Sequence, residues 1–592
     1  MESFYNYIPL SHSRHTRVLK ILPSSDKAAP ICFLLQEMPV DNPRYYEALS
    51  YTWAGQAMDR PVQCSGATLL ITANAESAIR RLRNRFTARY LWIDSICIDQ
   101  SSTLEKSSQV MMMAEIYGKA KRTLVWLGLG TKEMQAALSY IRTKQSIVEP
   151  TTSTGYLGES RIRALEMSTS NVPVVSGFPE DTTWLQNWSM KYQKSQVMKY
   201  DARSNIRQGL QEIANHPYWT RLWTVQEMAL SRTHRVYCGD SHYVSGNQLR
   251  DIVVRTLLLL NEPWDPMMPF NLQVDNPLFG NPLSIMAYKQ ASVPHDLVYG
   301  IRSLFPNSLG LVPVDYGRDL LELYVEVTKI FINTSDSMEV LQLACHGEKP
   351  LGWPSWVPNF SSPDIGKNVS WRNVYQYYGK QGSRYHAVRY SDDNKALFIP
   401  GVEIAAISDN ISEDFPLSTW SWLSADGWKG TQYGRYEQDF TTRHRLLQQF
   451  IAATRHRDDH ESIVESLFEF IFKSYLEITN DSPVLRAWVS SLVTGGAFQN
   501  TDATISLQYR AQFGYLTSKK RFFVTTDGRV GVSGGVQIGD TILLLSSSLD
   551  PFVLRHHPPN THKLISPAKI ESFQEESKRL ADGTLLVEFC LI

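Results

Sequence analysis

The stretch NHPYWTRLWTVQEMAL, residues 215–230, decides how the rest of the chain is interpreted. Pro217 suits the first turn of a helix, where its missing N–H is not needed. Trp219, Trp223 and Glu227 follow at i, i+4 and i+8, so in one continuous helix they would share a face. The stretch therefore predicts a helix on which a single carboxylate ends a row of two indoles.

Two interpretations of this helix are open from the residues alone. In the first, Trp219 and Trp223 are large core residues and Glu227 forms an ion pair with Arg221 or with a distant arginine. In the second, Glu227 serves a binding or catalytic site. Structural ion pairs outnumber catalytic carboxylates, so the rest of the chain has to decide between the two.

The composition narrows the class of protein. A chain of 592 residues is too long for one hydrophobic core and should divide into several domains. A hydrophobic content of 43% excludes global disorder. Lys and Arg number 59, as do Asp and Glu, so the formal net charge is zero. The chain therefore lacks the overall basic charge that would predict binding to nucleic acid or to an anionic membrane. A local basic patch remains compatible with this balance.

Cysteines and apolar runs bear on the compartment. The six cysteines are scattered, without a C-x-x-C pair or histidines at metal-binding spacing, which favours a reducing compartment and predicts no metal site. The N-terminus lacks the apolar core of a signal peptide, and no apolar run approaches the ~20 residues that cross a bilayer. We therefore expect a soluble, cytoplasmic protein without a membrane span.

Between residues 45 and 130 strands and helices alternate. Apolar runs predict strands at about 47–51, 90–94 and 123–127, and a fourth at 234–238 follows the tryptophan stretch. Helices are expected at 72–86, capped by Thr72, and at about 104–120. This alternation predicts an α/β fold with a parallel sheet flanked by helices.

Candidate site residues lie where these strands end. The carboxyl ends of parallel strands face the ligand crevice of an open α/β sheet. We therefore expect five side chains to converge on one cavity there: Ser50, Tyr51, Trp53, Asp94 and Glu227.

The remainder of the chain changes character twice. Residues 1–245 form the predicted α/β domain with an insertion at about 131–214, and 246–350 form a helical region that includes a helix from His295 to Leu304. A smaller β-rich module with inserted helices is expected over 351–592. Its hairpin turns are predicted at Asp392-Asp393-Asn394 and at Asp527-Gly528.

Three blocks of this sequence resemble the fungal heterokaryon-incompatibility (HET) domain family. They are YEALSYTWAG (46–55), the segment from LWIDSICIDQ to EIYGKAKRTLVWLG (91–128), and RLWTVQEMALS (221–231). Later pieces, HDLVYGI, VDYGRDLLELY, LGWPSWVPNF and RFFVTTDGRVGV, resemble sequences that often follow a HET domain. The family usually has Trp-Gly after its first strand, whereas this chain has Trp53-Ala54-Gly55.

HET domains are in turn similar to the Toll/interleukin-1 receptor (TIR) fold, a flavodoxin-like α/β architecture. Leu49-Ser50-Tyr51 resembles the first TIR strand, and Trp223 with Glu227 matches the TIR pattern Trp-x-x-x-Glu. In the enzymatic TIR members this Glu serves in NAD cleavage, so the resemblance implies Glu227 as a catalytic residue. It also implies Ser50, Tyr51, Trp53, Asp94 and Trp223 as residues that bind NAD, the substrate.

The resemblance leaves two functions open. One is a TIR-like NAD glycohydrolase that needs no further cofactor and triggers cell death after non-self recognition. The other is a non-catalytic module that signals by self-association or by contact with an unknown protein partner. Because TIR-like folds support both, the surroundings of Glu227 should discriminate between them.

Overall fold

The structure is a computed structural model that describes most of the chain. The described residues are 3–41, 45–53, 55–143, 205–249, 282–334, 338–363, 365, 388–415, 433–471, 516–548, 550–571, 573–583 and 586–592. They divide into two compact units, Met1–Leu320 and Leu321–Ile592. The expected division at 245 and 350 stays a prediction, and most of the predicted insertion lies outside the described residues.

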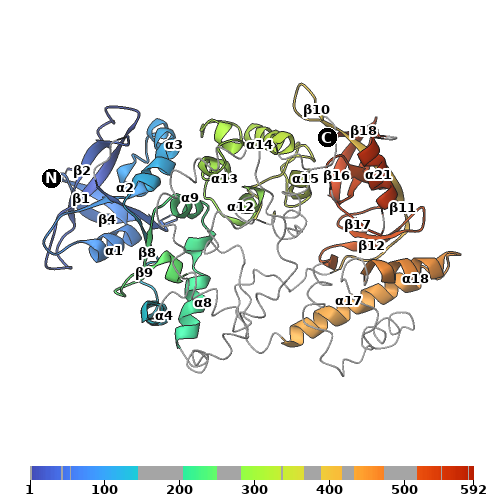
Figure 1. Cartoon of the computed structure of the whole chain (residues 1–592), viewed down its shortest axis with the longest axis horizontal. Helices are drawn as coiled ribbons and strands as arrows, with labels where there is room; N and C mark the ends of the chain where they lie inside the picture. The colour runs from blue at the N-terminus through green and yellow to red at the C-terminus, as the bar shows by residue number, and fades with distance from the viewer. Residues whose placement is uncertain are drawn as a thin grey trace. The chain divides into compact units, whose positions relative to one another are not determined.

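Unit 1 contains one large sheet with helices on both faces (Figure 1). Its described strands pair in the order β5-β4-β2-β1-β6-β3-β7-β8-β9. The strands are β1 His15–Ile21, β2 Cys32–Pro39, β3 Glu47–Tyr51, β4 Met58–Cys64, β5 Ala67–Thr72, β6 Arg89–Trp92, β7 Thr123–Trp126, β8 His234–Tyr237 and β9 Val244–Ser245. The helices among them are α1 Ala73–Leu82, α2 Asp94–Cys97, α3 Thr103–Lys119, α4 Lys132–Thr143, α8 Asn205–Ala214 and α9 Trp223–Ala229.

The four predicted strands form the centre of this sheet. β3 pairs in parallel with β6 and with β7, and β7 pairs in parallel with β8. Across the sheet the parallel strands follow the order β6-β3-β7-β8. If they are numbered 1 to 4 along the chain, this order is 2-1-3-4. This is the order in which flavodoxin-like sheets begin, so the sequence pattern predicted the parallel core correctly.

The sheet as a whole is mixed, and in this respect the expectation of a parallel sheet is wrong. β1 pairs antiparallel with both β2 and β6, and β4 with β5 and β8 with β9 are also antiparallel. Short connections explain the difference. Only two residues separate β4 from β5, and such a turn can join only antiparallel neighbours.

Helices cover the two faces of the parallel core. Trp126 of β7 donates its indole N–H to Asn74 Oδ1 of α1 at 2.8 Å, whereas Tyr117 of α3 donates to the backbone oxygen of Leu49 at 3.1 Å. Thr72 caps α1 through the backbone N–H of Ala75, as the sequence predicts. The predicted extension of this helix to residue 86 is wrong, because the chain leaves helical geometry at Arg83.

The tryptophan stretch is not one helix. Pro217–Thr220 forms a short 3-10 turn, η1, and α9 starts only at Trp223. Between them the backbone is extended, because Gln290 N donates to Thr220 O at 2.8 Å and Leu222 N donates to Gln290 O at 2.9 Å. This pairing with a distant segment interrupts the helix, so Trp219 does not continue the row of Trp223 and Glu227.

The last part of unit 1 consists of short helical segments: α12 Pro282–Tyr288, α13 Asp296–Tyr299, η3 Arg302–Leu304 and η4 Leu309–Leu311. The predicted helix from His295 to Leu304 is therefore divided into α13 and η3. Two of these segments contact the tryptophan stretch. Lys289, directly after α12, donates to Trp219 O at 2.8 Å, and Asp296 of α13 accepts from Trp223 Nε1 at 3.0 Å.

Unit 2 combines helices with a second sheet, as expected for a β-rich module. Its described helices are α14 Leu320–Thr334, which starts at the boundary, α15 Glu339–Ala344, α17 Tyr433–Ala453, α18 His460–Phe468 and α21 Gln574–Asp582. Its strands are β10 Arg389–Tyr390, β11 Leu397–Ile411, β12 Arg521–Thr525, β13 Val530–Ser533, β14 Thr541–Leu545, β15 Phe552–His557, β16 Thr561–Pro567, β17 Lys569–Ile570 and β18 Val587–Leu591.

Pairing within unit 2 confirms both predicted hairpins. β10 pairs antiparallel with β11 around Asn394, which has a φ of 59°, and β12 pairs antiparallel with β13 around Gly528, with a φ of 87°. The long strand β11 pairs with both β18 and β14. Together with β15 and β16 these strands form a closed ring of paired strands.

Candidate active site

Glu227 reaches the carboxyl end of the parallel core from α9. The last turn of α9 lies at the amino end of β7, where Thr123 Oγ1 donates to the backbone oxygen of Glu227 at 3.5 Å. Helical side chains tilt toward the N-terminus of their helix, so the carboxylate of Glu227 extends along the sheet toward Ser50. Ser50 Oγ donates a short hydrogen bond to Glu227 Oε2 and also contacts Tyr218 Oη at 2.5 Å.

Burial dominates the electrostatics of Glu227. The residue is 2% exposed, and this desolvation raises the pKa of its carboxyl to about 7. The positive charge of Arg221 and the Ser50 hydrogen bond lower the pKa, while the negative charge of Asp94 raises it further. Among the described residues no cation lies within ion-pair distance of Glu227. The carboxyl is therefore divided between its protonated and ionised forms near neutral pH.

Asp94 is the second acidic residue of this site, and its negative charge acts on Glu227. It is the first residue of α2, and its Oδ2 accepts from Trp53 Nε1 at 2.8 Å while its Oδ1 accepts from Ser95 N at 2.7 Å. Burial raises the pKa of Asp94, and Arg221 opposes this shift. Trp53, Asp94 and Arg221 are partly exposed, so they form the accessible part of the site.

We call this group the carboxyl-edge cluster; it consists of Ser50, Trp53, Asp94, Tyr218, Arg221 and Glu227. Four of the five side chains that the sequence predicts to converge belong to it. Direct hydrogen bonds join them in two pairs, Ser50 with Glu227 and Trp53 with Asp94. The charge of Arg221 acts on both carboxyls.

Tyr51 and Trp223 lie differently from the expectation. Neighbouring strand residues point to opposite faces, so Tyr51 points away from Ser50, and its hydroxyl pairs with Ser95 Oγ at 2.6 Å. Only its backbone oxygen, which accepts from Arg221, contacts the cluster. The indole N–H of Trp223 binds Asp296, whose other oxygen accepts from Tyr316 Oη at 2.7 Å.

Sequence reasoning missed Tyr218 and treated Arg221 only as an ion-pair partner. Tyr218 is fully buried and shares the hydroxyl of Ser50 with Glu227, and Arg221 is the cation whose charge acts on both Asp94 and Glu227. A signal for Arg221 was present. It stands between two tryptophans in a stretch otherwise suited to burial, where a guanidinium needs a specific partner.

The cluster offers acid–base groups and hydrogen-bond donors rather than a metal site. Within the described ranges no group of three or more His, Cys, Asp or Glu residues is placed to hold a metal ion. Likewise, no helix of the described segments is long and apolar enough to cross a bilayer. The chemistry of the cluster therefore has to be argued from its carboxyls, hydroxyls, indole and guanidinium.

Fold and cluster together define a class: an α/β domain with a flavodoxin-like strand order that buries a carboxyl near the carboxyl end of its first parallel strand. Comparison with known proteins finds a similarity over this region. Residues 46–227 match the sequence model of the family described as heterokaryon incompatibility protein (HET), and this segment extends from the beginning of β3 to Glu227. This part of the chain is therefore similar to the HET family.

One curated protein is also similar to the chain. The chain is 24% identical over 268 residues to heterokaryon incompatibility protein 6, OR allele, of Neurospora crassa. The match covers 41% of this chain and 35% of that relative, so the chain spans about a third of the relative's length. No solved structure matches the chain.

Proposed function

We propose that this chain is an incompatibility-type protein that triggers cell death after non-self recognition, and that its HET region is a TIR-like domain that cleaves the nicotinamide–ribose bond of NAD. The similarity to the Neurospora heterokaryon incompatibility protein and the match to the HET family support the incompatibility role. The strand order of the parallel core supports the TIR-like fold, because TIR domains are flavodoxin-like.

One observation carries the catalytic part of the proposal. The carboxyl of Glu227 is hydrogen-bonded by Ser50 near the end of the first parallel strand, in the place that the resemblance gives to the catalytic Glu. A strongly perturbed carboxyl at the crevice of an α/β sheet is a typical feature of an active site. A buried structural carboxylate would normally be neutralised by a close cation.

The chemistry follows from the charge that develops during cleavage. Breaking the nicotinamide–ribose bond gives the ribose oxocarbenium character, and an ionised carboxylate beside it stabilises the positive charge. Nicotinamide is a good leaving group, so a second acid is not required. Ser50 would hold the carboxylate in place, and partly exposed Trp53 and Asp94 would contact the sugar and the nicotinamide ring.

The same observation predicts a pH dependence. Only the ionised carboxylate stabilises the oxocarbenium ion, and burial raises the pKa of Glu227 to about 7. Cleavage by the free enzyme should therefore increase as the pH rises through about 7 and then level off.

Burial also favours a second candidate, the non-catalytic assembly module. Glu227 is 2% exposed. Ser50 is hydrogen-bonded to Glu227, and Tyr218 in turn is hydrogen-bonded to Ser50. For NAD to reach Glu227, the contact between Ser50 and Tyr218 has to open. If it opens only in an assembly of several copies, catalysis and self-association are linked. If it never opens, the domain acts by contact alone.

Nicotinamide release from NAD by the purified full chain tests the proposal. Glu227→Gln preserves shape but removes the charge, so turnover should fall by about 10²–10³ while the protein stays folded, with a melting temperature no lower than that of the wild type at neutral pH. Glu115→Gln is the matched control, because it removes a partly exposed carboxylate from α3 of the same domain.

The outcomes separate the two candidates. Equal turnover by the wild type and Glu227→Gln would overturn the catalytic assignment. A wild type that stays inactive both as a dilute protein and after chemical cross-linking of its assemblies would favour the non-catalytic module.

A further inference from the structure

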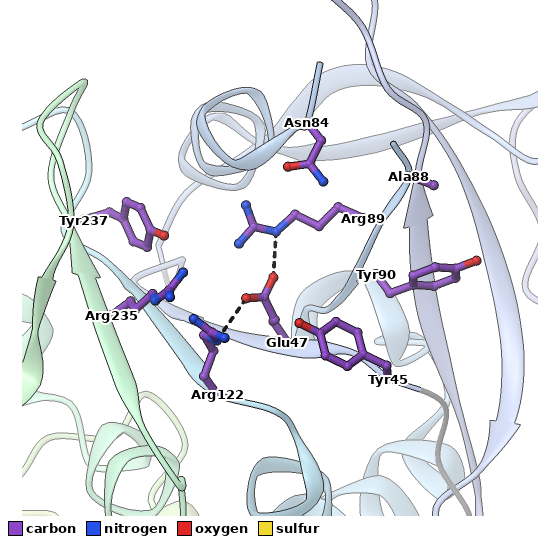
Figure 2. Close-up of a pocket in the computed structure, with 9 residues that line it drawn as sticks. All are labelled: Tyr45, Glu47, Asn84, Ala88, Arg89, Tyr90, Arg122, Arg235 and Tyr237. Atoms are coloured by element: carbon purple, nitrogen blue, oxygen red, sulfur yellow. Dashed lines mark hydrogen bonds and ion pairs between the residues drawn. The ribbon is translucent and has the colours of Figure 1, made fainter. Parts of the chain in front are cut away.

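A cavity of about 460 Å³ lies at the opposite edge of the same sheet, away from the carboxyl-edge cluster. Its described lining comes mostly from the beginnings of the parallel strands and from the segment after α1, and Tyr237 at the end of β8 completes it (Figure 2). We call it the arginine pocket; its lining residues are Tyr45, Glu47, Asn84, Ala88, Arg89, Tyr90, Arg122, Arg235 and Tyr237.

The sheet register explains why these residues meet. Ala48 pairs with Thr123, so the preceding residues, Glu47 and Arg122, stand side by side at the amino edge. On the next strand Arg235 pairs with Leu124, which lies two residues after Arg122 on the same face of the sheet. Arg235 therefore belongs to this face as well. Because side chains alternate along a strand, all three belong to the face that α1 covers.

Charge in the pocket is unbalanced. Glu47 is the single carboxylate of the lining, and it is 2.7 Å from Arg89 Nε and 3.3 Å from Arg122 Nε. Three guanidinium groups and one carboxylate leave a net charge of +2. Arg89 also donates from Nη1 to Leu82 O at 2.7 Å, at the end of α1. Glu47 makes its shorter contact with Arg89, so we assign the excess charge to Arg122 and Arg235.

Both of these arginines retain hydrogen-bonding capacity. Arg122 Nε is buried and makes no hydrogen bond, since its contact with Glu47 lacks the required geometry. Arg235 lies over the ring of Tyr243 with its Cζ 4.1 Å from the ring centroid. Stacking of this kind occupies the face of a guanidinium and leaves the N–H groups at its edge. Among the described residues Arg235 has no carboxylate partner.

We propose that the arginine pocket binds a nucleotide, with the phosphates on Arg122 and Arg235 and the nucleoside against the tyrosines of the rim. Arginines recognise phosphate through paired, charge-assisted hydrogen bonds, and a net positive cavity attracts an anion. The volume falls within the range of small-molecule sites. Tyr45 is 58% exposed at the rim, and although Lys121 Nζ lies over its ring, 4.5 Å from the centroid, the other face is one on which a base can stack.

This site is separate from the one proposed for NAD cleavage. Glu47 and Ser50 both belong to β3, but they lie near its opposite ends and point to opposite faces of the sheet. Nucleotide binding in the arginine pocket therefore does not depend on Glu227. Because β3 contributes Glu47 to the arginine pocket and Ser50 to the carboxyl-edge cluster, a nucleotide in the pocket would lie beside the strand that positions Ser50.

Isothermal titration of the full chain with ATP and with inorganic pyrophosphate tests the proposal. ATP should bind the wild type more tightly than pyrophosphate does. Arg235→Gln should weaken ATP binding by about tenfold or more, the usual effect of losing a hydrogen bond to a charged group. Arg235→Lys should retain part of the affinity. Arg142→Gln, which removes an exposed positive charge from α4, should leave the affinity unchanged.

Two further measurements locate the ligand. Tyr45→Ala should weaken ATP binding without changing pyrophosphate binding, and Glu227→Gln should bind ATP as the wild type does. The proposal is overturned if ATP does not bind at millimolar concentration, or if Arg235→Gln and Arg142→Gln bind ATP equally. Equal affinity for pyrophosphate and ATP would overturn the assignment of a nucleotide.

Discussion

Two buried glutamates at opposite edges of one sheet show how differently the same side chain can be accommodated. Glu47 is 6% exposed at the amino edge and lies between Arg89 and Arg122. Glu227 is 2% exposed near the carboxyl edge, where its close contact is the hydroxyl of Ser50. The first carboxylate is neutralised by cations, whereas the second is stabilised mainly by taking up a proton.

This difference separates structural from reactive charge. A carboxylate between two guanidinium groups joins neighbouring strands through ion pairs. A carboxyl with a pKa near 7 changes its charge at small cost, and this property suits a catalytic group. At the amino edge the groups available to a ligand are instead the arginines whose positive charge is not balanced by Glu47.

The largest effect is expected for Glu47→Ala. Removing this carboxylate leaves Arg89 and Arg122, which are 16% and 15% exposed, without their carboxylate partner, and losing one side of a largely buried ion pair costs about 3 kcal/mol. Urea unfolding of the full chain measures this loss. Glu115→Ala is the control, because its ion pairs with Arg14 and Lys119 are exposed and should contribute less than about 1 kcal/mol.

An equal, small cost for Glu47→Ala and Glu115→Ala would contradict the comparison. It would mean that the amino edge does not depend on Glu47, and that the charges of Arg89 and Arg122 are already satisfied in another way.

An effect of nearly the same size should appear as a pH dependence at the other edge. In the folded protein the pKa of Glu227 is raised from 4.5 to about 7, so the folded state binds the proton more tightly than the unfolded state does. The resulting stabilisation is complete below about pH 4.5 and is lost as the pH rises to about 7. A shift of this size corresponds to about 3 kcal/mol.

The contribution of Glu227 is isolated by comparing the wild type with Glu227→Gln at each pH. Buried histidines such as His216 and His234 have lowered pKa values and change stability in the opposite direction, but they do so in both proteins. The difference in free energy of unfolding should therefore change by about 3 kcal/mol between pH 4.5 and 7. A constant difference over this range would show that Glu227 is ionised throughout.

The sequence predicted the parallel core because each strand is a short apolar run that ends near a polar residue. The expectation that Ser50, Asp94 and Glu227 form one site follows from the edge that the carboxyl ends of parallel strands share. The hydrogen bond between Ser50 and Glu227 agrees with it, and the shared site stays a prediction. The interruption of the tryptophan helix could not be predicted, because it depends on backbone pairing with Gln290, which follows about 70 residues later. Helical spacing describes only local preferences, and a tertiary contact overrides them.

The arginine pocket escaped sequence reasoning for a related reason. Its charged residues are separated by more than 30 residues at each step and form no motif. A signal was nevertheless present, because a charged residue stands at or next to the beginning of each parallel strand: Glu47, Arg89, Arg122 and Arg235. Amino ends of parallel strands also share an edge, so the argument used for one edge of the sheet applies equally to the other.

The smallest predicted effect concerns Ser50→Ala, which sharpens the comparison at the carboxyl edge. The substitution removes the hydrogen bond to Glu227 and the contact with Tyr218 Oη, and should cost about 1–2 kcal/mol. Because the hydrogen bond from Ser50 lowers the pKa of Glu227, its loss should raise that pKa further. Ionisation of Glu227 then becomes less favourable in the folded state, so the cost of Ser50→Ala should be larger at pH 8 than at pH 5.

Ser95→Ala is the matched control, since it removes a buried hydroxyl that pairs with Tyr51 on the opposite face of the sheet. Its cost should be the same at both pH values. If Ser50→Ala shows no pH dependence either, Ser50 does not stabilise the ionised form of Glu227. The hydroxyl would then serve packing alone, and the carboxyl-edge cluster would lose the group that orients its carboxylate toward a substrate.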